Sequence, residues 1–150
     1  MNGYLVINLE KFDALENDSR ICKLLHSKYK NTIVAPDFLT PIDAKSYISE
    51  MDIFIGARMH ATIAAFSTGV VTIPFSYSKK FEGLFGNINY PYVISAREIS
   101  TEEALRQTNQ FIVDRKVIQE CQKESMLEVT KRLLFMQNIL KNILDDMEKG

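Results

Sequence analysis

The fold of this chain is decided by residues 51–77, which read MDIFIGARMHATIAAFSTGVVTIPFSY. The apolar run from Asp52 to Ile55 is short and continuous, which is typical of a strand covered on both faces. Small residues then fill His60 to Thr68 and predict a helix, which Gly69 ends. A second apolar strand follows from Val70 to Ile73, closed by the next proline. Strand, helix and strand in this order predict a βαβ unit with parallel strands.

The same alternation continues on both sides of this stretch. Further strands are expected at residues 4–8, 32–35 and 92–94, and further helices at residues 19–29, 79–85 and after residues 40 and 100. Thr40 and Pro41 are typical of an N-cap and a first helical position, and Ser100 and Glu103 of a capping box. We therefore expect an α/β domain with a doubly wound, mostly parallel sheet over residues 1–112.

Residues 113–150 are expected to form a helical tail with an apolar pattern of its own. Six apolar residues recur at alternating steps of four and three, which makes a narrow seam along a long helix: Val129, Leu133, Met136, Leu140, Ile143 and Met147. Two explanations fit this seam equally well. It docks onto a partner chain or a missing domain, or it packs against the sheet of its own domain.

Composition narrows the class of protein. Hydrophobic residues make up 46% of the 150 residues and charged residues 25%, which is typical of a globular domain. The net charge of −1 gives no overall attraction to nucleic acid or to an anionic membrane, so any anion site must be local. No apolar run is long enough for a membrane span, and the N-terminus does not resemble a signal peptide. Cys22 and Cys121 form no metal-binding or disulfide pattern, so we expect idle thiols in a cytoplasmic protein.

The residues after the first strand of the βαβ unit are suited to binding an anion. Ligands of open α/β sheets bind beyond the carboxyl ends of the strands, where Arg58 and His60 are expected. The helix that begins there offers unpaired N–H groups and a partial positive charge. Arg58 adds a planar group that grips an oxyanion, and His60 adds a group that titrates near neutral pH. Gly56 keeps the loop free of a side chain where a ligand would approach.

The segment that follows the neighbouring strand carries hydroxyl groups and two lysines, Lys79 and Lys80. We expect these side chains to face the same crevice as Arg58 and His60. Simpler explanations have similar weight, since an arginine near a helix start is often a surface charge and a single histidine is often structural. The two lysines are equally compatible with a solvated helix start. Glycine-rich cofactor motifs, a P-loop and a nucleophile elbow are absent from the sequence.

At these residues the sequence resembles the polysaccharide pyruvyl transferase family. The resemblance rests on an acidic residue before an apolar strand, a Gly-x-Arg-x-His-Ala motif, a small-residue helix and a Tyr-x-x-Lys segment after the next strand. These features correspond here to Asp52, Gly56 to Ala61, the following helix up to Gly69, Pro74, and Tyr77 to Lys80.

The resemblance implies transfer of a pyruvyl group from phosphoenolpyruvate to a sugar of a cell-surface polysaccharide, such as an exopolysaccharide. It implies that Arg58 and His60 are catalytic residues of the donor site, with Met59 adding a backbone contact. Tyr77 and Lys80 correspond to the second donor-binding motif of the family. Phosphoenolpyruvate is then the donor substrate, and neither a cofactor nor a metal is needed.

The resemblance also implies a Rossmann-like fold, similar to the C-terminal half of a B-type glycosyltransferase. Such a fold places a second α/β half upstream, on the acceptor side of the cleft. From its length we expect the chain to be a fragment or a truncated product, or to meet that half on another polypeptide. The helical tail would then bind the absent half or a second copy.

Two other functions remain open. One is a glycosyltransferase-like domain for a nucleotide sugar, and the other is a non-catalytic half-domain that acts as a binding or assembly subunit.

Overall fold

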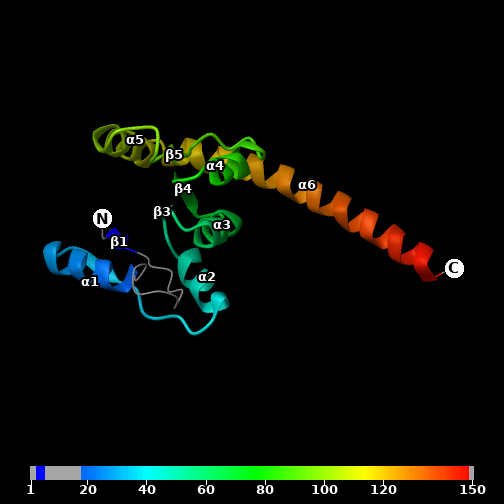
Figure 1. Ribbon diagram of the computed structural model, residues 1–150, viewed down its shortest axis with the longest axis horizontal. Coiled ribbons are helices and arrows are strands. Elements are labelled where there is room, and N and C mark those ends of the chain that lie inside the picture. Colours follow the sequence, from blue (N-terminus) through cyan, green and yellow to red (C-terminus); the bar gives the residue numbers. More distant parts are fainter. Residues whose placement is uncertain (1–2, 6–17, 149–150) are drawn as a thin grey trace. The chain divides into compact units, whose positions relative to one another are not determined.

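A computed structural model describes residues 3–5 and 18–148 of the chain (Figure 1). The chain divides into two compact units, Met1–Met51 and Asp52–Gly150, here called the N-terminal and C-terminal units. This division does not test the domain boundary expected after residue 112, which stays a prediction. None of the described helices is long and apolar enough to cross a membrane.

The N-terminal unit contains a parallel two-stranded sheet and two helices. β1 (Gly3–Leu5) pairs with β2 (Thr32–Val34), with Tyr4 opposite Ile33. The helices are α1 (Asp18–Lys28) and α2 (Pro41–Ser49). At the start of α2 the Thr40 hydroxyl accepts from the Asp43 N–H while the Asp43 carboxylate accepts from Thr40, so the expected cap is confirmed. Residues 6–8 of the first expected strand lie outside the described residues.

The C-terminal unit is built on a three-stranded parallel sheet. Its strands are β3 (Ile53–Gly56), β4 (Val71–Ser76) and β5 (Ile94–Ser95), in the order β3-β4-β5. Helix α3 (Met59–Thr68) connects β3 to β4 and ends at Gly69, whose φ of 84° is left-handed. Glycine adopts this conformation without a steric penalty. The βαβ unit expected from residues 51–77 is therefore confirmed.

Two expectations about these strands were wrong. β4 continues through Pro74 to Ser76, because the ladder to β3 ends at Pro74 and the ladder to β5 begins at Phe75, so the missing N–H of proline falls between the two. β4 is covered on both faces but β3 is not, since Ile55 of β3 is 43% exposed. The described strands form a two-stranded sheet in the N-terminal unit and a three-stranded sheet in the C-terminal unit, and the doubly wound arrangement expected over residues 1–112 stays a prediction.

Three helices complete the C-terminal unit: α4 (Lys79–Gly86), α5 (Thr101–Val113) and α6 (Arg115–Glu148). An aromatic core joins them, with Phe66 of α3 edge-on to Phe85 and Tyr90 at centroid distances of 5.5 and 4.9 Å. Ile118 of α6 is fully buried in the same core. At the start of α5 the Ser100 hydroxyl accepts from the Glu103 N–H, while the Glu103 carboxylate binds Arg106 and Gln107, so half of the expected capping box forms.

The two parts of α6 have different surroundings. Residues Ile118, Gln122 and Ser125 are buried in the C-terminal unit. Beyond them the helix continues away from the sheet (Figure 1), and the seam residues from Leu133 onward are about half exposed or more. The sheet of the C-terminal unit therefore does not cover this part of the helix, and what packs on the seam stays a prediction.

Candidate functional site

The topology of the C-terminal unit brings the predicted site residues to one edge of the sheet. β3 and β4 are neighbours and parallel, with Gly56 opposite Pro74, so their carboxyl ends share an edge. α3 begins after β3 at this edge, and α4 begins after β4. Arg58, Met59 and His60 therefore emerge at the same edge as Tyr77 and Lys80.

Arg58 is the N-cap residue of α3, in extended backbone conformation. Its side chain is half-buried, that of Met59 is half-buried, and that of His60 is exposed. Arginine has no side-chain acceptor for the N–H groups of the first helical turn. The N-caps of α2, α4 and α5 are threonine and serines, which do accept from their helices. Of these four helices, α3 alone begins without a side-chain cap from its N-cap residue, and the N–H groups of a first helical turn are suited to binding an anion.

Gly56 is required for a reason other than the expected approach of a ligand. A Cβ atom there would lie 2.3 Å from Cε1 of Phe54 and 3.3 Å from the Thr62 hydroxyl oxygen. Phe54 is buried, so its ring has little room to move. The glycine therefore lets the chain pass close to the Phe54 ring on its way to Arg58.

Thr62 holds the same turn and was not singled out from the sequence. It is fully buried in α3, and its hydroxyl donates to the carbonyls of Arg58 at 2.9 Å and Gly56 at 3.3 Å. These two bonds fix the backbone on both sides of the turn that presents Arg58. A threonine four residues after an N-cap is the available sequence signal, because its hydroxyl often bonds the carbonyl one turn earlier.

The segment after β4 divides into groups that hold the loop and groups that face solvent. The Ser76 hydroxyl donates to the Ser78 carbonyl at 2.9 Å, and the Ser78 hydroxyl caps α4 by accepting from the Phe81 N–H. These hydroxyls therefore serve the loop rather than a crevice. Tyr77 is 55% exposed and stacks on Phe81 with an interplanar angle of 23°. Lys80 is exposed, as is Lys79.

The charges at this edge run against the usual preference of helix N-termini for acidic residues. The first turn of α3 holds no acidic residue, and Arg58 precedes it. The first turn of α4 holds Lys79 and Lys80 against one acid, Glu82, which accepts from Ser95 at 2.6 Å. Cations placed beside the positive ends of two helix dipoles raise the local positive potential, which a bound anion lowers. The arrangement is therefore suited to an anionic ligand.

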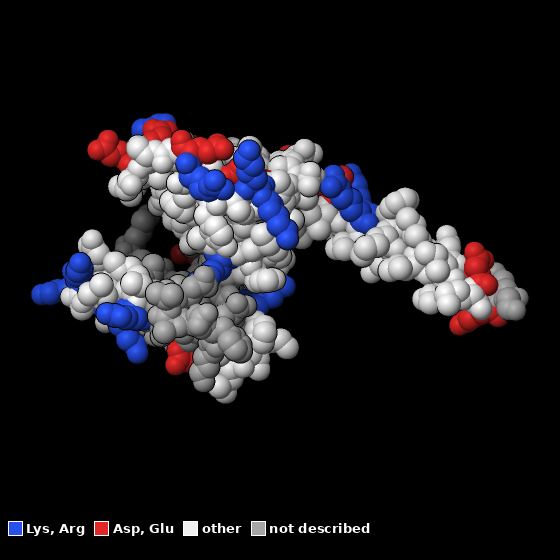
Figure 2. All heavy atoms as spheres, viewed as in Figure 1, with Lys and Arg blue, Asp and Glu red and all other residues white. Residues whose placement is uncertain are grey.

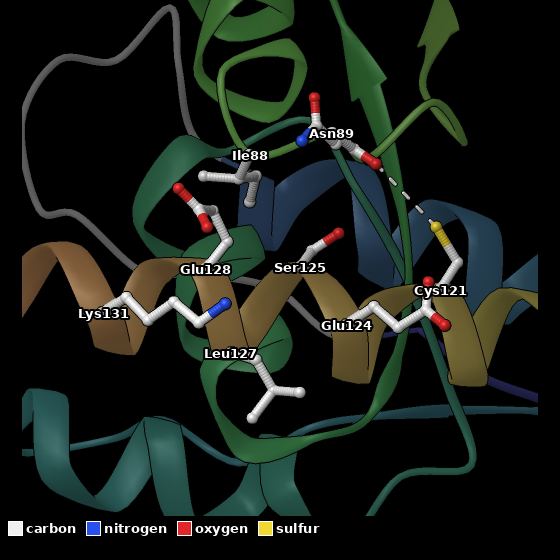
Figure 3. A pocket seen from close by; sticks show the side chains of 8 residues that line it. All are labelled: Ile88, Asn89, Cys121, Glu124, Ser125, Leu127, Glu128 and Lys131. Carbon is white, nitrogen blue, oxygen red and sulfur yellow. Dashed lines mark hydrogen bonds between the residues drawn. The ribbon is translucent and has the colours of Figure 1, made fainter.

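A pocket of about 330 Å³ in the same unit is lined by α6 and by the turn that follows α4 (Figure 3). Glu124, Glu128 and Lys131 of α6 line it together with Cys121, whose Sγ lies 3.9 Å from the Asn89 carbonyl oxygen. Burial raises the pKa of the Cys121 thiol, which keeps it protonated and a poor nucleophile. Cys22 is buried and Cys121 is half-buried, and neither forms a disulfide. The described residues contain no group of three or more His, Cys, Asp or Glu side chains placed to hold a metal ion.

Comparison with known proteins identifies the family. The family model described as polysaccharide pyruvyl transferase matches residues 3–79, which is just over half of the chain. The match contains Arg58, Met59, His60 and Tyr77 and ends one residue before Lys80. Neither a curated protein nor a solved structure matches the chain. The matched share is enough to establish that this chain belongs to the polysaccharide pyruvyl transferase family.

Proposed function

We propose that this chain binds phosphoenolpyruvate at the shared edge of β3 and β4 and forms the donor side of a pyruvyl transferase site. The acceptor in this proposal is a sugar of a cell-surface polysaccharide. One observation carries the proposal: α3 and α4 begin at one sheet edge, and both beginnings bear cations. Phosphoenolpyruvate carries a carboxylate and a phosphate, so it needs two neighbouring groups of anion-binding donors.

The proposed reaction converts the enol ester into a ketal. C3 of phosphoenolpyruvate gains a proton, and C2 forms bonds to two hydroxyl oxygens of the sugar while its bond to the phosphate oxygen breaks. The two hydroxyls lose two protons in total. One balances the proton gained at C3, and the other leaves with the phosphate.

Each site residue has a role that suits its chemistry. Arg58 grips an anionic group of the donor through parallel N–H bonds, and the Met59 backbone N–H adds a donor at the helix start. His60 acts as the general acid toward C3 or stabilises the departing phosphate; a positioned acid contributes about 10²–10⁴ in rate. Lys80 is a second phosphate partner, and Tyr77 borders the site beside it.

The proposal includes a Rossmann-like fold of the B-type glycosyltransferase kind, in which this chain supplies the donor half. The acceptor half would come from a further α/β half-domain. A site with one wall binds the donor but does not align an acceptor or exclude water well. We therefore expect donor binding by the chain alone and little turnover.

Calorimetric titration of the full chain with phosphoenolpyruvate tests this function. A charge-assisted bond contributes about 1.5–3 kcal/mol, so Arg58→Ala should weaken binding about tenfold or more. His60→Ala and Lys80→Ala should weaken it by smaller factors. Lys141→Ala removes an exposed cation from the outer part of α6 and should leave the affinity unchanged. Inorganic phosphate alone should bind more weakly than phosphoenolpyruvate, because it lacks the carboxylate.

Two results would contradict the proposal. Equal affinity of the parent and the Arg58→Ala and His60→Ala variants would show that the donor binds elsewhere or not at all. Binding of a nucleoside diphosphate, with no binding of phosphoenolpyruvate, would instead favour a glycosyltransferase-like function.

A further inference from the structure

The outer part of α6 carries an apolar surface that the described C-terminal unit does not cover. Exposed fractions are 49% for Leu133, 50% for Met136, 51% for Leu140 and 50% for Ile143. The same face of the helix is buried further upstream, at Ile118 and Gln122 among others. The seam therefore continues a packed face beyond the end of its own core, which is the usual position of a protein–protein contact.

The spacing of the seam assigns heptad positions. Leu133, Leu140 and Met147 occupy position a, and Val129, Met136 and Ile143 occupy position d. Ile139 at position g and Leu144 at position e border the seam and are 42% and 60% exposed. Residues 129–147 span about 27 Å at the rise of an α-helix.

We propose that two copies of this chain associate through these segments of α6, packed antiparallel about a two-fold axis near residue 138. In this register each a residue faces a d residue of the other copy. Leu133 meets Ile143, Leu140 meets Met136, and Met147 meets Val129. By symmetry these three pairs give six layers, in which every seam residue is covered by an apolar side chain.

Charge selects the antiparallel arrangement over the parallel one. Figure 2 shows basic side chains on α6 where it leaves the rest of its unit and acidic ones at its far end, with uncharged atoms between. In the antiparallel register g positions face each other, so Arg132 lies opposite Asp146 of the second copy, twice in the dimer. In a parallel pair g positions face e positions of the second copy, so Arg132 would lie near Gln137 and both ion pairs would be lost.

Arg132 has donors left for this contact. Its Nε donates to Glu128 one turn earlier at 2.9 Å. The guanidinium carries five N–H donors, so the two terminal nitrogens are able to bind a carboxylate of the second copy at the same time.

Sedimentation equilibrium of the full chain tests the proposal over concentrations from about 1 µM to about 500 µM. We expect a monomer–dimer equilibrium that Leu140→Glu abolishes, with the helix content by circular dichroism preserved. Arg132→Asp or Asp146→Arg alone should weaken the dimer about threefold to thirtyfold, since each change affects two exposed ion pairs. The double variant Arg132→Asp/Asp146→Arg should regain most of the parent affinity. Asp145→Arg lies at position f, outside the seam, and should have no effect.

A chain that stays monomeric over this range overturns the proposal, and so does a dimer that Leu140→Glu leaves intact. Dimerisation in which the double variant is no tighter than the single variants overturns the antiparallel register. Binding of phosphoenolpyruvate takes no part in these measurements, so the outcome is independent of the proposed function.

Discussion

Gly56 shows how a single residue prepares the candidate site without touching a ligand. It ends β3 two residues before Arg58, and a side chain in its place would overlap the ring of Phe54. We expect Gly56→Ala to lower the free energy of unfolding by about 1–3 kcal/mol, the usual cost of overpacking a buried site. Urea denaturation of the full chain measures this loss.

Gly83 provides the matched control. It lies within α4, and a Cβ atom there would have no neighbour within 4 Å. Alanine is the better helix former by about 0.5–1 kcal/mol, so Gly83→Ala should leave the stability unchanged or raise it. A Gly56→Ala variant as stable as the parent would show that the Phe54 ring adapts, and glycine would then need another explanation.

Sequence reasoning located the candidate residues but not the residues that hold them. Arg58 and Tyr77 follow successive strands, and parallel strands place their carboxyl ends at one edge whatever the details of packing. Thr62 acts through a hydrogen bond of 3.3 Å to the Gly56 carbonyl, and Phe54 acts through a ring that fills the space a Cβ atom at Gly56 would need. Such contacts depend on side-chain conformations that spacing does not determine.

At the scale of elements, α6 replaces part of a strand beside β4. β5 begins opposite Phe75, so Thr72 lies in a stretch of β4 that β5 does not reach. The N–H of Thr72 donates to Gln122 of α6 at 3.1 Å, and its carbonyl accepts from the Tyr90 hydroxyl. Burial strongly raises the pKa of Tyr90, which keeps this donor protonated. The side chains of Gln122 and Tyr90 thus satisfy the buried N–H and carbonyl of Thr72, which would otherwise pair with a strand.

Replacing Gln122 tests this role. Gln122→Met keeps the size of the side chain but leaves the Thr72 N–H without its partner, which costs about 1–3 kcal/mol. The carbonyls of Phe66 and Val70, which also bind Gln122, keep other donors in Gly69 and Thr72. Urea denaturation should therefore show a loss in this range.

The control for this variant is Gln119→Met, an exposed position on the same helix. It should change the stability by less than about 0.5 kcal/mol. Equal effects of the two substitutions would mean that Gln122 contributes through general packing and not through its hydrogen bonds.

Element boundaries were predictable where a local signal fixed them. Thr40, Gly69 and Ser100 each act on neighbouring backbone, and α2, α3 and α5 begin or end at these residues as expected. Pro74 was expected to end its strand but does not. Whether a proline ends a strand depends on which neighbouring strand pairs at that position, and the sheet determines this, not the local sequence. The seam of α6 was ambiguous for the same reason, since spacing shows which residues share a face but not what covers it.

At the scale of the whole molecule, the charge of the chain and the charge of the site have opposite signs. The net charge is −1, so the chain as a whole does not attract phosphoenolpyruvate. Attraction must come from Arg58, Lys79 and Lys80 together with the two helix N-termini. Local fields of this kind are screened over a Debye length of about 8–10 Å at physiological salt.

Binding should therefore depend on salt but not on the total charge of the chain. We expect the dissociation constant for phosphoenolpyruvate to rise about threefold or more between about 0.05 M and about 0.5 M potassium chloride. Lys141→Glu changes the net charge by −2 on the outer part of α6 and should leave both the affinity and its salt dependence unchanged. Arg58→Ala should reduce the salt dependence, because one of the screened contacts is gone. Calorimetric titration at several salt concentrations separates these cases. If Lys141→Glu weakened binding as much as Arg58→Ala, the attraction would belong to the molecule as a whole, and the edge of β3 and β4 would lose its claim to be the anion site.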